Sequence, residues 1–400
     1  MNSYDSTICI VGAGPAGLIT ALGLARLGVP FVHLDQDDGP VAESRGLVVH
    51  AGALEVLDEL GLAQELVAAG LHVPEFRITV AGHTAMRIPI HQVATPFPYI
   101  LLVPQATTEA LLYRRLTAVG HAPLARHHVN TIISSGDGHV VEGTDAAGTP
   151  FRVRARYLVG ADGLRSTVRP ALGIRFPQHT YDTAFLSADV QLDNGPSSAQ
   201  AHIHPSRHGL LFMAPLSGDR WRLIISVPAP GGRRPTPPTL PQVQRYLDER
   251  GGQGVTVVCL DRAAGVLLHH GVADAFGAGR AILAGDAAHV HSPAGGMGMN
   301  TGIQDGYDAA LTLAAIHRGA DAATALAGYR ERRLRAAREV VAFTDRIMRL
   351  VTLDDAGIHL LRSMALAGAG RLPFLRRRIA QAVSCVTRTP VRTGAPTLLT

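Results

Sequence analysis

The sequence of 400 residues contains no lysine, so all 37 of its basic residues are arginines. Without lysine the chain cannot form a Schiff base, anchor pyridoxal phosphate or supply the lysine of a phosphate-binding P-loop. Cysteine is also scarce, and Cys9, Cys259 and Cys385 lie far apart in the sequence. Their spacing argues against a disulfide framework, a metal knuckle or a redox CxxC pair. We therefore expect no metal site and a cytoplasmic location.

Long apolar runs are missing as well. No stretch of about 18 uncharged apolar residues occurs, so no membrane span is expected. The first predicted strand begins by residue 7, which predicts that no signal peptide precedes it. Arginines gather within residues 330–392, a pattern typical of a solvated helix surface. Aromatic interleaving and nucleic-acid reader motifs are absent, so nucleic-acid binding is not expected.

A glycine-rich turn follows the first predicted strand, Thr7–Val11. Residues 12–17 read Gly-Ala-Gly-Pro-Ala-Gly, the pattern of a dinucleotide-binding fold. In that pattern Gly12 makes the tight turn, Gly14 lets the backbone approach a pyrophosphate, and Gly17 lets helix and strand pack closely. The N-terminus of the following helix offers backbone N–H groups to the phosphates. This segment predicts a site for a dinucleotide.

An acid follows at the distance that such a fold requires. A second predicted strand, Phe31–Leu34, ends at Asp35, which lies 23 residues after Gly12 (35 − 12). An acid about 20 residues after the glycine turn binds a ribose 2′-hydroxyl. Because a carboxylate disfavours a 2′-phosphate, the ligand of this element is FAD or NAD rather than NADP.

A second nucleotide-like element lies 268 residues further on (285 − 17). A predicted buried strand, Ala281–Ala284, leads into Gly285 and Asp286, and a helix begins after the glycines at 295, 296 and 298. A helix N-terminus stabilises developing negative charge, such as that at N1 and the C2 carbonyl of a reduced flavin. Asp286 can accept hydrogen bonds from ribityl hydroxyls. The two elements predict the two ends of one FAD.

The segments between these elements alternate in character. Helices are predicted at residues 50–60, at Thr108–Leu116 and from Gly302 to about residue 383. Strands are predicted at Phe151–Tyr157, Ala184–Leu192, Leu210–Ala214 and Trp221–Val227, and residues 228–241 are a proline-rich loop. The predicted fold is α/β: a Rossmann-like FAD-binding domain with an inserted α+β substrate domain built on a β-sheet, and a helical C-terminus. The boundaries are 1–72, 101–178 and 273–320 for the FAD-binding domain, 73–100 and 179–272 for the β-rich substrate domain, and 321–400 for the C-terminal helical segment, without a thioredoxin-like domain.

Taken together, the motifs resemble the class A flavoprotein monooxygenases, the family of para-hydroxybenzoate hydroxylase and the aromatic-polyketide hydroxylases. The resemblance covers most of residues 5–345. It rests on residues 12–17 with Asp35, Arg45 with 48–55, 103–105 with Glu109, 159–169, 285–305 and the closing 329–333. It implies bound FAD and a transient electron donor, NADPH or NADH, since no second strand–GxGxxG–helix element exists.

The resemblance also implies which residues hold FAD. Arg45 and Gln105 would hold the pyrophosphate and ribityl region, and Asp162 and Gly163 would shape a groove shared with the nicotinamide donor. Pro293 would lie near the flavin C4a atom. The full predicted set is Gly12, Gly14, Ala16, Gly17, Asp35, Arg45, Gln105, Asp162, Gly163, Asp286, Pro293, Gly298, Met299 and Asn300.

Two positions depart from the family pattern. Many relatives place an arginine at the position of Gly52 and a glutamine at the position of Met297. We expect FAD binding to survive both changes, whereas the motion of the flavin would be affected.

The implied reaction inserts one atom of O2, through a C4a-hydroperoxyflavin, into an aromatic, phenolic or polycyclic polyketide-like metabolite. An epoxidase, a Baeyer–Villiger oxygenase and a non-catalytic FAD- or ligand-binding protein remain alternatives, whereas a halogenase is disfavoured without lysine and with one tryptophan. No catalytic base is assigned, and Pro293 and His50 are the candidates carried forward. The substrate, the preferred nicotinamide and a homodimer stay open. The reaction needs a dry site, for which the candidate lining is Phe97, Tyr99, Phe185, Phe212, Met213 and Trp221.

Overall fold

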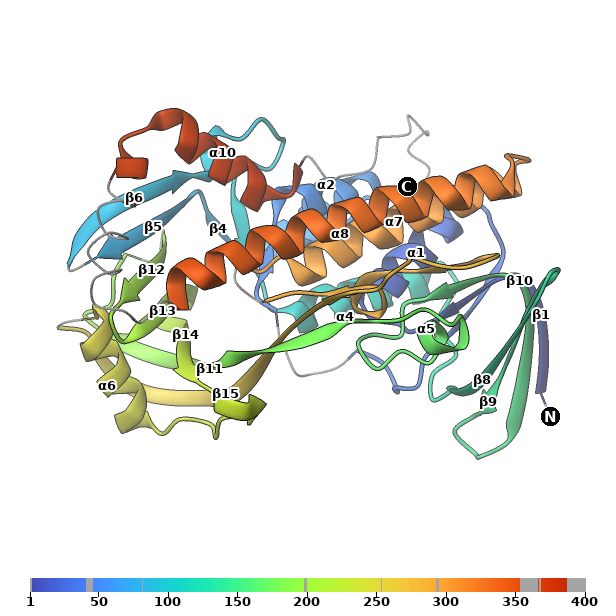
Figure 1. The fold of residues 1–400 in the computed structure, drawn as a ribbon, viewed down its shortest axis with the longest axis horizontal. Helices are drawn as coiled ribbons and strands as arrows, with labels where there is room; N and C mark the ends of the chain where they lie inside the picture. Colours follow the sequence, from blue (N-terminus) through green and yellow to red (C-terminus); the bar gives the residue numbers. More distant parts are fainter. Residues whose placement is uncertain are drawn as a thin grey trace.

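The computed structural model describes residues 2–40, 46–80, 82–197, 200–252, 254–292, 295–352, 366 and 368–386. It contains two large sheets at opposite ends of an elongated molecule, with long helices between them (Figure 1). The predicted α/β class is confirmed by this architecture.

The six-stranded sheet carries the first glycine-rich turn. Its order is β2-β1-β10-β9-β8, and β16 pairs with the last residues of β10, beyond the part that pairs with β9. The strands β2, β1, β10 and β16 run parallel, and β9 and β8 extend the sheet in antiparallel fashion. The bounds are β1 Asn2–Val11, β2 Phe31–Leu34, β8 His128–Ser135, β9 Gly138–Thr144, β10 Pro150–Gly160 and β16 Ala281–Leu283. In a parallel sheet of this kind, ligands bind beyond the carboxyl ends of the strands.

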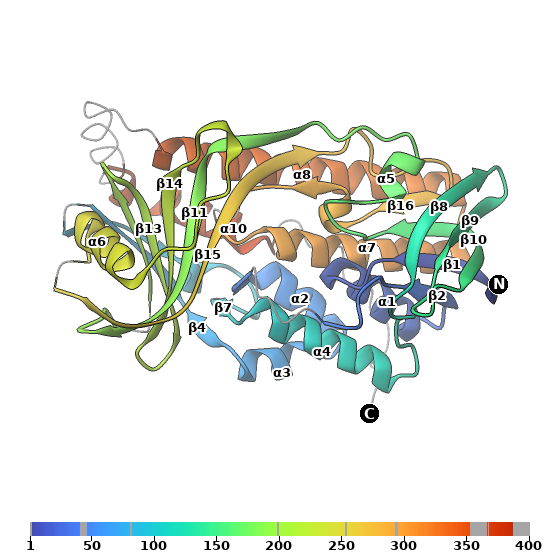
Figure 2. The same ribbon diagram turned by 90° about the horizontal axis from the view of Figure 1, so that it is seen from below.

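The register brings the loops that follow three of these strands together. Val11 pairs with Gly160, and Gly160 pairs with Leu283, so the strands end at one level. Helix α1 (Pro15–Arg26) packs against α7 (Gly298–His317). The two glycine-rich elements, far apart in sequence, thus meet at one edge of the sheet (Figure 2).

The second sheet has eight strands in the order β17-β15-β11-β14-β13-β12-β5-β6. Its bounds are β5 Glu75–Val80, β6 His83–Pro89, β11 Gln178–Asp193, β12 Ala201–Ser206, β13 Gly209–Ser217, β14 Arg220–Pro228, β15 Thr256–Val272 and β17 His289–Val290. Most of these strands come from residues 73–100 and 179–272. Helix α6 (Leu240–Arg250) covers one face, where Trp221, Val243 and Leu247 are buried together.

Helix α6 was not predicted from the sequence, which indicated only a proline-rich loop at residues 228–241. It begins inside that loop because Thr239 and Gln242 form a capping box and Pro241 stands in the first turn, where the missing N–H of proline costs nothing. The single helical region predicted from Gly302 onward is also divided. Helix α7 ends at His317, and Gly319 adopts φ +100° before the next helix.

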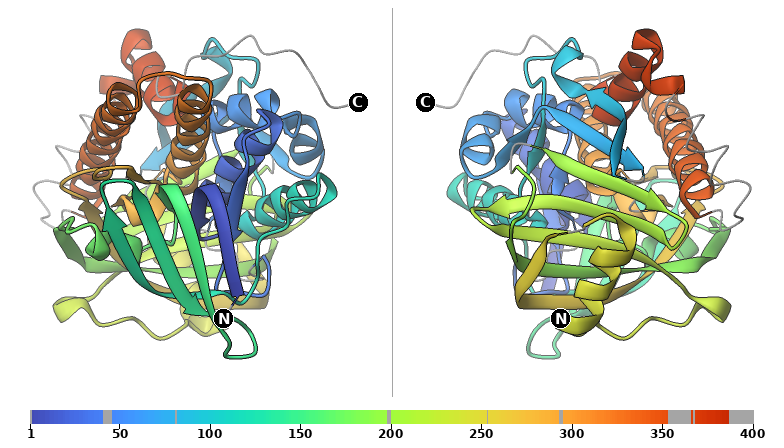
Figure 3. Two further views of the ribbon diagram at one scale, coloured as in Figure 1. Left: turned by 90° about the vertical axis from the view of Figure 1, so that its right-hand side faces the viewer. Right: turned by 90° about the vertical axis from the view of Figure 1, so that its left-hand side faces the viewer.

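The remaining elements lie between or beside the two sheets, as seen from below in Figure 2 and along the long axis in Figure 3. Strands β3, β7 and β4 form a small sheet, and α8 runs from the six-stranded sheet to the face of the eight-stranded sheet that α6 leaves uncovered. The bounds are β3 Val48–Val49, α2 Ala51–Glu59, α3 Ala63–Ala68, β4 Leu71–Val73, β7 Ile100–Leu102, α4 Gln105–Ala118, α5 Val168–Ala171, α8 Ala322–Thr352 and α10 Pro373–Ser384.

Candidate active site

The first glycine-rich turn is built as a cradle. Gly12 has φ +102°, and a Cβ atom there would lie 2.3 Å from the carbonyl oxygen of Ala161. A Cβ atom on Gly17 would lie 1.9 Å from the carbonyl oxygen of Gly12. At Gly14 the situation is reversed, because a Cβ atom would meet no atom of the described residues within 4 Å. Gly12 and Gly17 are thus required by packing, whereas Gly14 faces open space.

Helix α1 begins directly at this open space. Gly14 is its N-cap and provides no side-chain cap, so the N–H groups of the first turn are available to an anion. Ala16 lies in this turn and packs with Ala161 and Ala284, which come from the loops after β10 and β16. The three strand ends are therefore packed around one helix N-terminus.

Asp35 lies at the end of β2, beside the same turn. Its carboxylate accepts hydrogen bonds from the backbone N–H groups of Ala13 and Asp37. Burial raises the pKa of Asp35, against the opposing effect of these two hydrogen bonds. The buried ring of His33 lies within hydrogen-bond distance of the Gly12 carbonyl, at 2.9 Å from Nε2. Burial lowers the pKa of His33 to about 4, so the ring is neutral near pH 7.

Asp162 follows β10 and has one oxygen engaged. Oδ2 accepts hydrogen bonds from the N–H groups of Thr167 (2.6 Å) and Val168 (3.0 Å). Oδ1 is buried and has no hydrogen-bond partner among the described residues. A buried polar atom without a partner is costly unless a ligand or water satisfies it. Gly163, at φ +75°, turns the chain immediately after this acceptor.

Gln105, at the start of α4, holds the end of the segment that contains Arg45. Its backbone N–H donates to the carbonyl of Gly46 (2.9 Å), and its Oε1 accepts from the N–H of Gly46 (3.1 Å). Nε2 donates to Glu109 (2.7 Å). Arg45 and Pro293 lie outside the described residues, so their predicted contacts with FAD stay predictions.

Asn300 connects the start of α7, which was predicted to meet the flavin ring, to the segment that leads into α2. Its Oδ1 accepts from the N–H of His50 (2.7 Å), and its Nδ2 donates to the carbonyls of Val48 (2.8 Å) and Gly296 (2.7 Å). The ring of His50 lies within hydrogen-bond distance of the Gly295 carbonyl, at 2.6 Å. Asn300 and His50 are fully buried. The N-termini of α2 and α7 are therefore joined by polar contacts.

Gly298 and Met299 form the first turn of α7, and both are partly exposed. They stand directly before the buried Asn300, on the same helix N-terminus. This terminus has no side-chain cap, so it can stabilise negative charge on a ligand.

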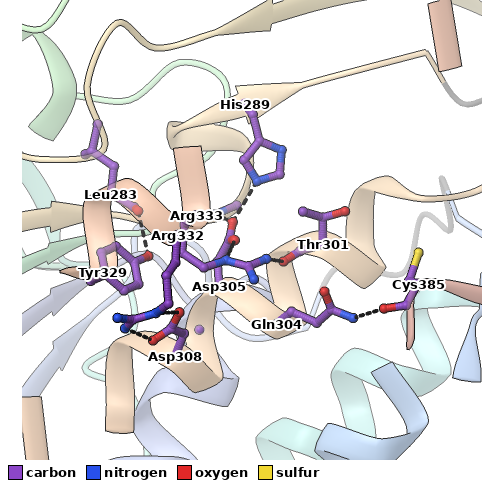
Figure 4. Close-up of polar contacts among 12 residues, drawn as sticks. Leu283, His289, Thr301, Gln304, Asp305, Asp308, Tyr329, Arg332, Arg333 and Cys385 are labelled. Carbon is purple, nitrogen blue, oxygen red and sulfur yellow. Dashed lines mark hydrogen bonds and ion pairs between the residues drawn. The ribbon is translucent and has the colours of Figure 1, made fainter. Parts of the chain in front are cut away.

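Asp305 on α7 joins the turn after β16 to helix α8, as Figure 4 shows. Its carboxylate accepts hydrogen bonds from the N–H of Gly285 (3.0 Å), from Nε2 of His289 (2.6 Å) and from Nε of Arg333 (2.5 Å). Burial raises the pKa of Asp305, but the charges of Arg333 and His289 outweigh burial and lower that pKa to about 2. The ionised carboxylate fixes the turn.

Arg169 holds the same turn from its other side. It donates to the carbonyls of Ala287 (2.8 Å) and Leu164 (2.9 Å), so it links the loop after β10 to the turn after β16. Asp286 lies in this turn with an exposed side chain. The backbones that carry Asp162 and Asp286 are thereby held beside each other at the carboxyl edge of the sheet.

Asp305, Arg169 and Arg333 were not among the site residues predicted from the sequence. One signal was available for Asp305 and Arg333, because charged residues inside buried helices are rarely tolerated without a partner. A second signal is that Asp305 and Arg333 belong to two of the motifs on which the resemblance rests, 285–305 and 329–333. The partners themselves could not be paired before the packing of α7 on α8 was known.

The two departures from the family pattern lie against the same residue. A Cβ atom on Gly52 would lie 2.5 Å from the carbonyl oxygen of Cys385. Met297 is fully buried and packs with Cys385 and Val340. Both positions therefore face the end of α10.

The aromatic residues predicted to line the site divide between several clusters. Trp221 and Met213 are buried on the face of the eight-stranded sheet that α6 covers. Side chains alternate between the two faces along a strand, so the neighbours of these residues point to the opposite face. Trp221 and Met213 are core residues and do not line the site, contrary to the prediction. Phe185 and Phe212 point to the other face, where Ile347 and Met348 of α8 pack near Phe185. Phe97 and Tyr99 pack with the core around α2.

His202 and His204 also lie on the α6 side, with ring centroids 6.1 Å apart. Burial lowers the pKa of His204 to about 4, with a further contribution from His202. Within the described parts of the chain, no group of three or more His, Cys, Asp or Glu residues is arranged to hold a metal ion. Across those same parts, no helix is long and apolar enough to cross a bilayer.

A family model described as "FAD binding domain" matches residues 5–344. The chain belongs to this family of FAD-dependent monooxygenases. It is 33% identical over 379 residues to a 6-methylpretetramide 4-monooxygenase of Streptomyces rimosus, covering 93% of this chain and 67% of that protein. It is 30% identical over 393 residues to an uncharacterized aromatic compound monooxygenase of Bacillus subtilis (strain 168), covering 96% and 76%.

A solved structure gives the same result. The structure of the anhydrotetracycline hydroxylase OxyS from Streptomyces rimosus superposes with a TM-score of 0.80 at 29% identity, over 98% of this chain and 79% of that one. The family, the FAD and NAD(P)H requirement and the monooxygenase class predicted from the sequence are confirmed by these matches.

Proposed function

We propose that the enzyme binds one FAD from the Gly12–Gly17 turn to the N-terminus of α7 and hydroxylates a polycyclic or phenolic aromatic compound. The observation that carries the placement is the convergence of three unfilled features at one sheet edge. Judged on the described residues, these are the space that a Cβ atom on Gly14 would leave uncontested, the start of α1 without a side-chain cap, and Oδ1 of Asp162 without a hydrogen-bond partner.

In this placement each group of the chain has a distinct task. The N–H groups of α1 hold the pyrophosphate, and Asp35 accepts from the adenosine ribose. Asp286 accepts hydrogen bonds from the ribityl hydroxyls, and the side-chain amide of Gln105 donates to the same region. The start of α7 at Gly298 stabilises negative charge at the ring. When bound, FAD supplies the transfer of electrons from NAD(P)H to O2 and of one oxygen atom to the substrate.

The substrate side of the proposal rests on the face of the eight-stranded sheet opposite α6. Phe212 and Ile224 lie on this face, next to each other across β13 and β14. In the following row Arg222 makes a two-point ion pair with Asp189, at 2.7 and 2.8 Å. A face that offers apolar side chains beside a polar pair suits a flat aromatic compound that carries hydroxyl groups. The names of the relatives, which include tetracycline-type compounds, support the polycyclic class.

Turnover assays test the function. The purified protein is loaded with FAD, its absorption spectrum is recorded, and NADH and NADPH oxidation is followed with a panel of phenols and polycyclic polyketides. We expect a yellow protein whose NAD(P)H oxidation accelerates with one group of these compounds, and a product one oxygen heavier. The position of that oxygen, read by NMR, separates hydroxylation from epoxidation and Baeyer–Villiger insertion.

Substitution of Asp286 tests the placement. We expect Asp286→Ala to weaken FAD binding at least tenfold, whereas Asp248→Ala on the distant helix α6 leaves it unchanged. Equal FAD affinity in the two variants would contradict the assignment of Asp286. Flavin reduction that no compound accelerates would favour a ligand-binding protein. A cytoplasmic location and a homodimer stay predictions, and gel filtration tests the second.

A further inference from the structure

The residues that follow Gly368 form a strap across the substrate sheet. We define the C-terminal strap as residues 370–386, which contain α10. Arg377 donates to Gln92 (3.1 Å), and a Cβ atom on Gly370 would lie 2.3 Å from the carbonyl oxygen of Ala85. Ala380 and Val383 are buried in the cluster that contains Val48. The strap is thus packed along β6 and reaches the segment that leads into α2.

The strap ends in a specific backbone conformation. Cys385 follows α10 with φ +58°, in the left-handed region. This turn points its carbonyl oxygen at Gln304 of α7, whose Nε2 donates to it at 3.0 Å (Figure 4). The thiol is buried, at 1% exposure. The carbonyl of Cys385 is therefore an acceptor placed against α7 itself.

The same carbonyl leaves no room for a side chain on α2. A Cβ atom on Gly52 would lie 2.5 Å from the oxygen of Cys385 and 2.6 Å from Nε2 of Gln304. Contacts this short do not occur in folded proteins, so any larger residue at Gly52 displaces the strap end or Gln304. On the other side of Cys385, the fully buried Met297 packs against it directly before α7.

We infer that Gln304 and the end of the strap at Cys385 are positioning residues for the flavin-ring end of the site. Gly52 lies in the first turn of α2 and Met297 immediately precedes α7, so the strap end is held between the two helix N-termini. Asn300 and His50 join the same two termini through hydrogen bonds. The strap and this polar tie together fix the separation of α2 and α7. The inference rests on the proposed placement of FAD.

The strap therefore limits how far the ring end of the cofactor moves. When the strap is displaced, the start of α7 loses the packing of Met297, and Gln304 loses an acceptor. We expect weaker FAD binding and a larger fraction of NADPH consumed as NADPH + H⁺ + O2 → NADP⁺ + H2O2. This balance uses only the donor and oxidant of the established reaction.

The test uses Cys385 as a built-in probe. The exposed Cys259 is replaced by serine, and the labelling rate of the remaining thiols with a disulfide reagent is measured in full-length protein. Cys9 stays silent because it is buried in the six-stranded sheet, and burial raises its pKa to about 12. The labelling phase that disappears when Cys385 is replaced by alanine is assigned to the Cys385 thiol.

Gly52→Ala is compared with Gly368→Ala. Gly368 lies just before the strap, and a Cβ atom there would meet no described atom within 4 Å. In Gly52→Ala we expect Cys385 to label at least tenfold faster, the FAD dissociation constant to rise at least fivefold, and the share of H2O2 per NADPH to rise at least twofold. FAD fluorescence should rise as the ring becomes mobile. Gly368→Ala should match the parent in all four measurements.

Each outcome has one meaning. Fast labelling with unchanged FAD affinity, fluorescence and H2O2 share overturns the inference and leaves the proposed FAD site intact. Unchanged labelling in Gly52→Ala overturns it as well. If Gly52→Ala does not fold, Gln304→Met, which removes the donor and keeps the volume, must show the same changes. Failure of the parent protein to bind FAD refutes the proposed function, and the labelling result still reports on the strap.

Discussion

The side chain of Asn300 accepts a hydrogen bond from the backbone N–H of His50 at 2.7 Å, across 250 residues of sequence. Through its amide nitrogen it also binds the carbonyls of Val48 and Gly296. One buried side chain thus serves three backbone groups from two segments.

Asn300→Leu removes these three hydrogen bonds while keeping a similar side-chain volume. A buried polar group that loses its hydrogen bond costs about 1–3 kcal/mol, so we expect at least a tenfold loss of FAD affinity and a lower melting temperature. Asn300→Asp keeps the acceptor for His50 and should lie between Asn300→Leu and wild type. Asn130→Ala, at an exposed position on β8, serves as the control. Fluorescence titration with FAD measures the effect, and equal affinity in Asn300→Leu would contradict it.

Two glycines in the first turn should respond differently to one methyl group. Gly14→Ala places its Cβ atom in space that the described residues leave empty, so the apoprotein should keep its melting temperature. FAD binding should be lost because the methyl group takes the place of the pyrophosphate. Gly17→Ala instead meets the Gly12 carbonyl and should destabilise the apoprotein. Calorimetry without FAD and titration with FAD separate the two effects; retained FAD binding in Gly14→Ala would refute the placement of the pyrophosphate.

Removing the charge of Asp305 tests the buried network. Asp305→Asn leaves Arg333, which is 3% exposed, without its charged partner. Breaking a buried pair costs about 3–5 kcal/mol, and urea denaturation should show a loss of that order. Glu331→Gln on α8 is the control, because Glu331 and its partner Arg335 are 72% and 67% exposed and an exposed pair is worth at most about 1 kcal/mol. Similar losses in both variants would contradict the role of Asp305.

The buried histidines should make stability depend on pH. Burial lowers the pKa of His33 and of His204 to about 4, from an ordinary value of 6.5. Between these pH values the unfolded chain binds protons that the folded chain excludes, so the free energy of unfolding falls as pH falls from 6.5 to 4. Each shift corresponds to about 3 kcal/mol. His204→Gln should reduce this slope in urea titrations at pH 7, 6, 5 and 4, whereas an unchanged slope would contradict the assignment.

The sequence was informative where local chemistry determines structure. The turn from Gly12 to Gly17 and the helix start at Gly298 were predictable because glycine and helix ends have specific uses in phosphate and anion binding. Helix α6 was readable in principle from Thr239 and Gln242, but the surrounding prolines favoured a loop. The helix forms because the capping box stabilises its start and because proline is tolerated in the first turn of a helix.

Other features depend on contacts that no local pattern encodes. The predicted lining included Trp221 because large aromatic residues suit both a core and a pocket, and only the position of α6 decides which face of the sheet is core. Likewise, Gly52 and Met297 were visible as departures from a pattern, but their common neighbour, Cys385, lies at the other end of the chain. Tertiary packing supplied what the spacing of residues could not.

Strand β15 has a mechanical consequence. It runs as one strand from Thr256 to Val272, with register shifts against β11, and its last residue pairs with His289. The strand that pairs with β11, one of the strands of the substrate face, is therefore paired at its far end with His289, which binds Asp305. The contacts from Val272 through His289 and Asp305 to Gly285 therefore tie the position of β15 to the turn that presents Asp286.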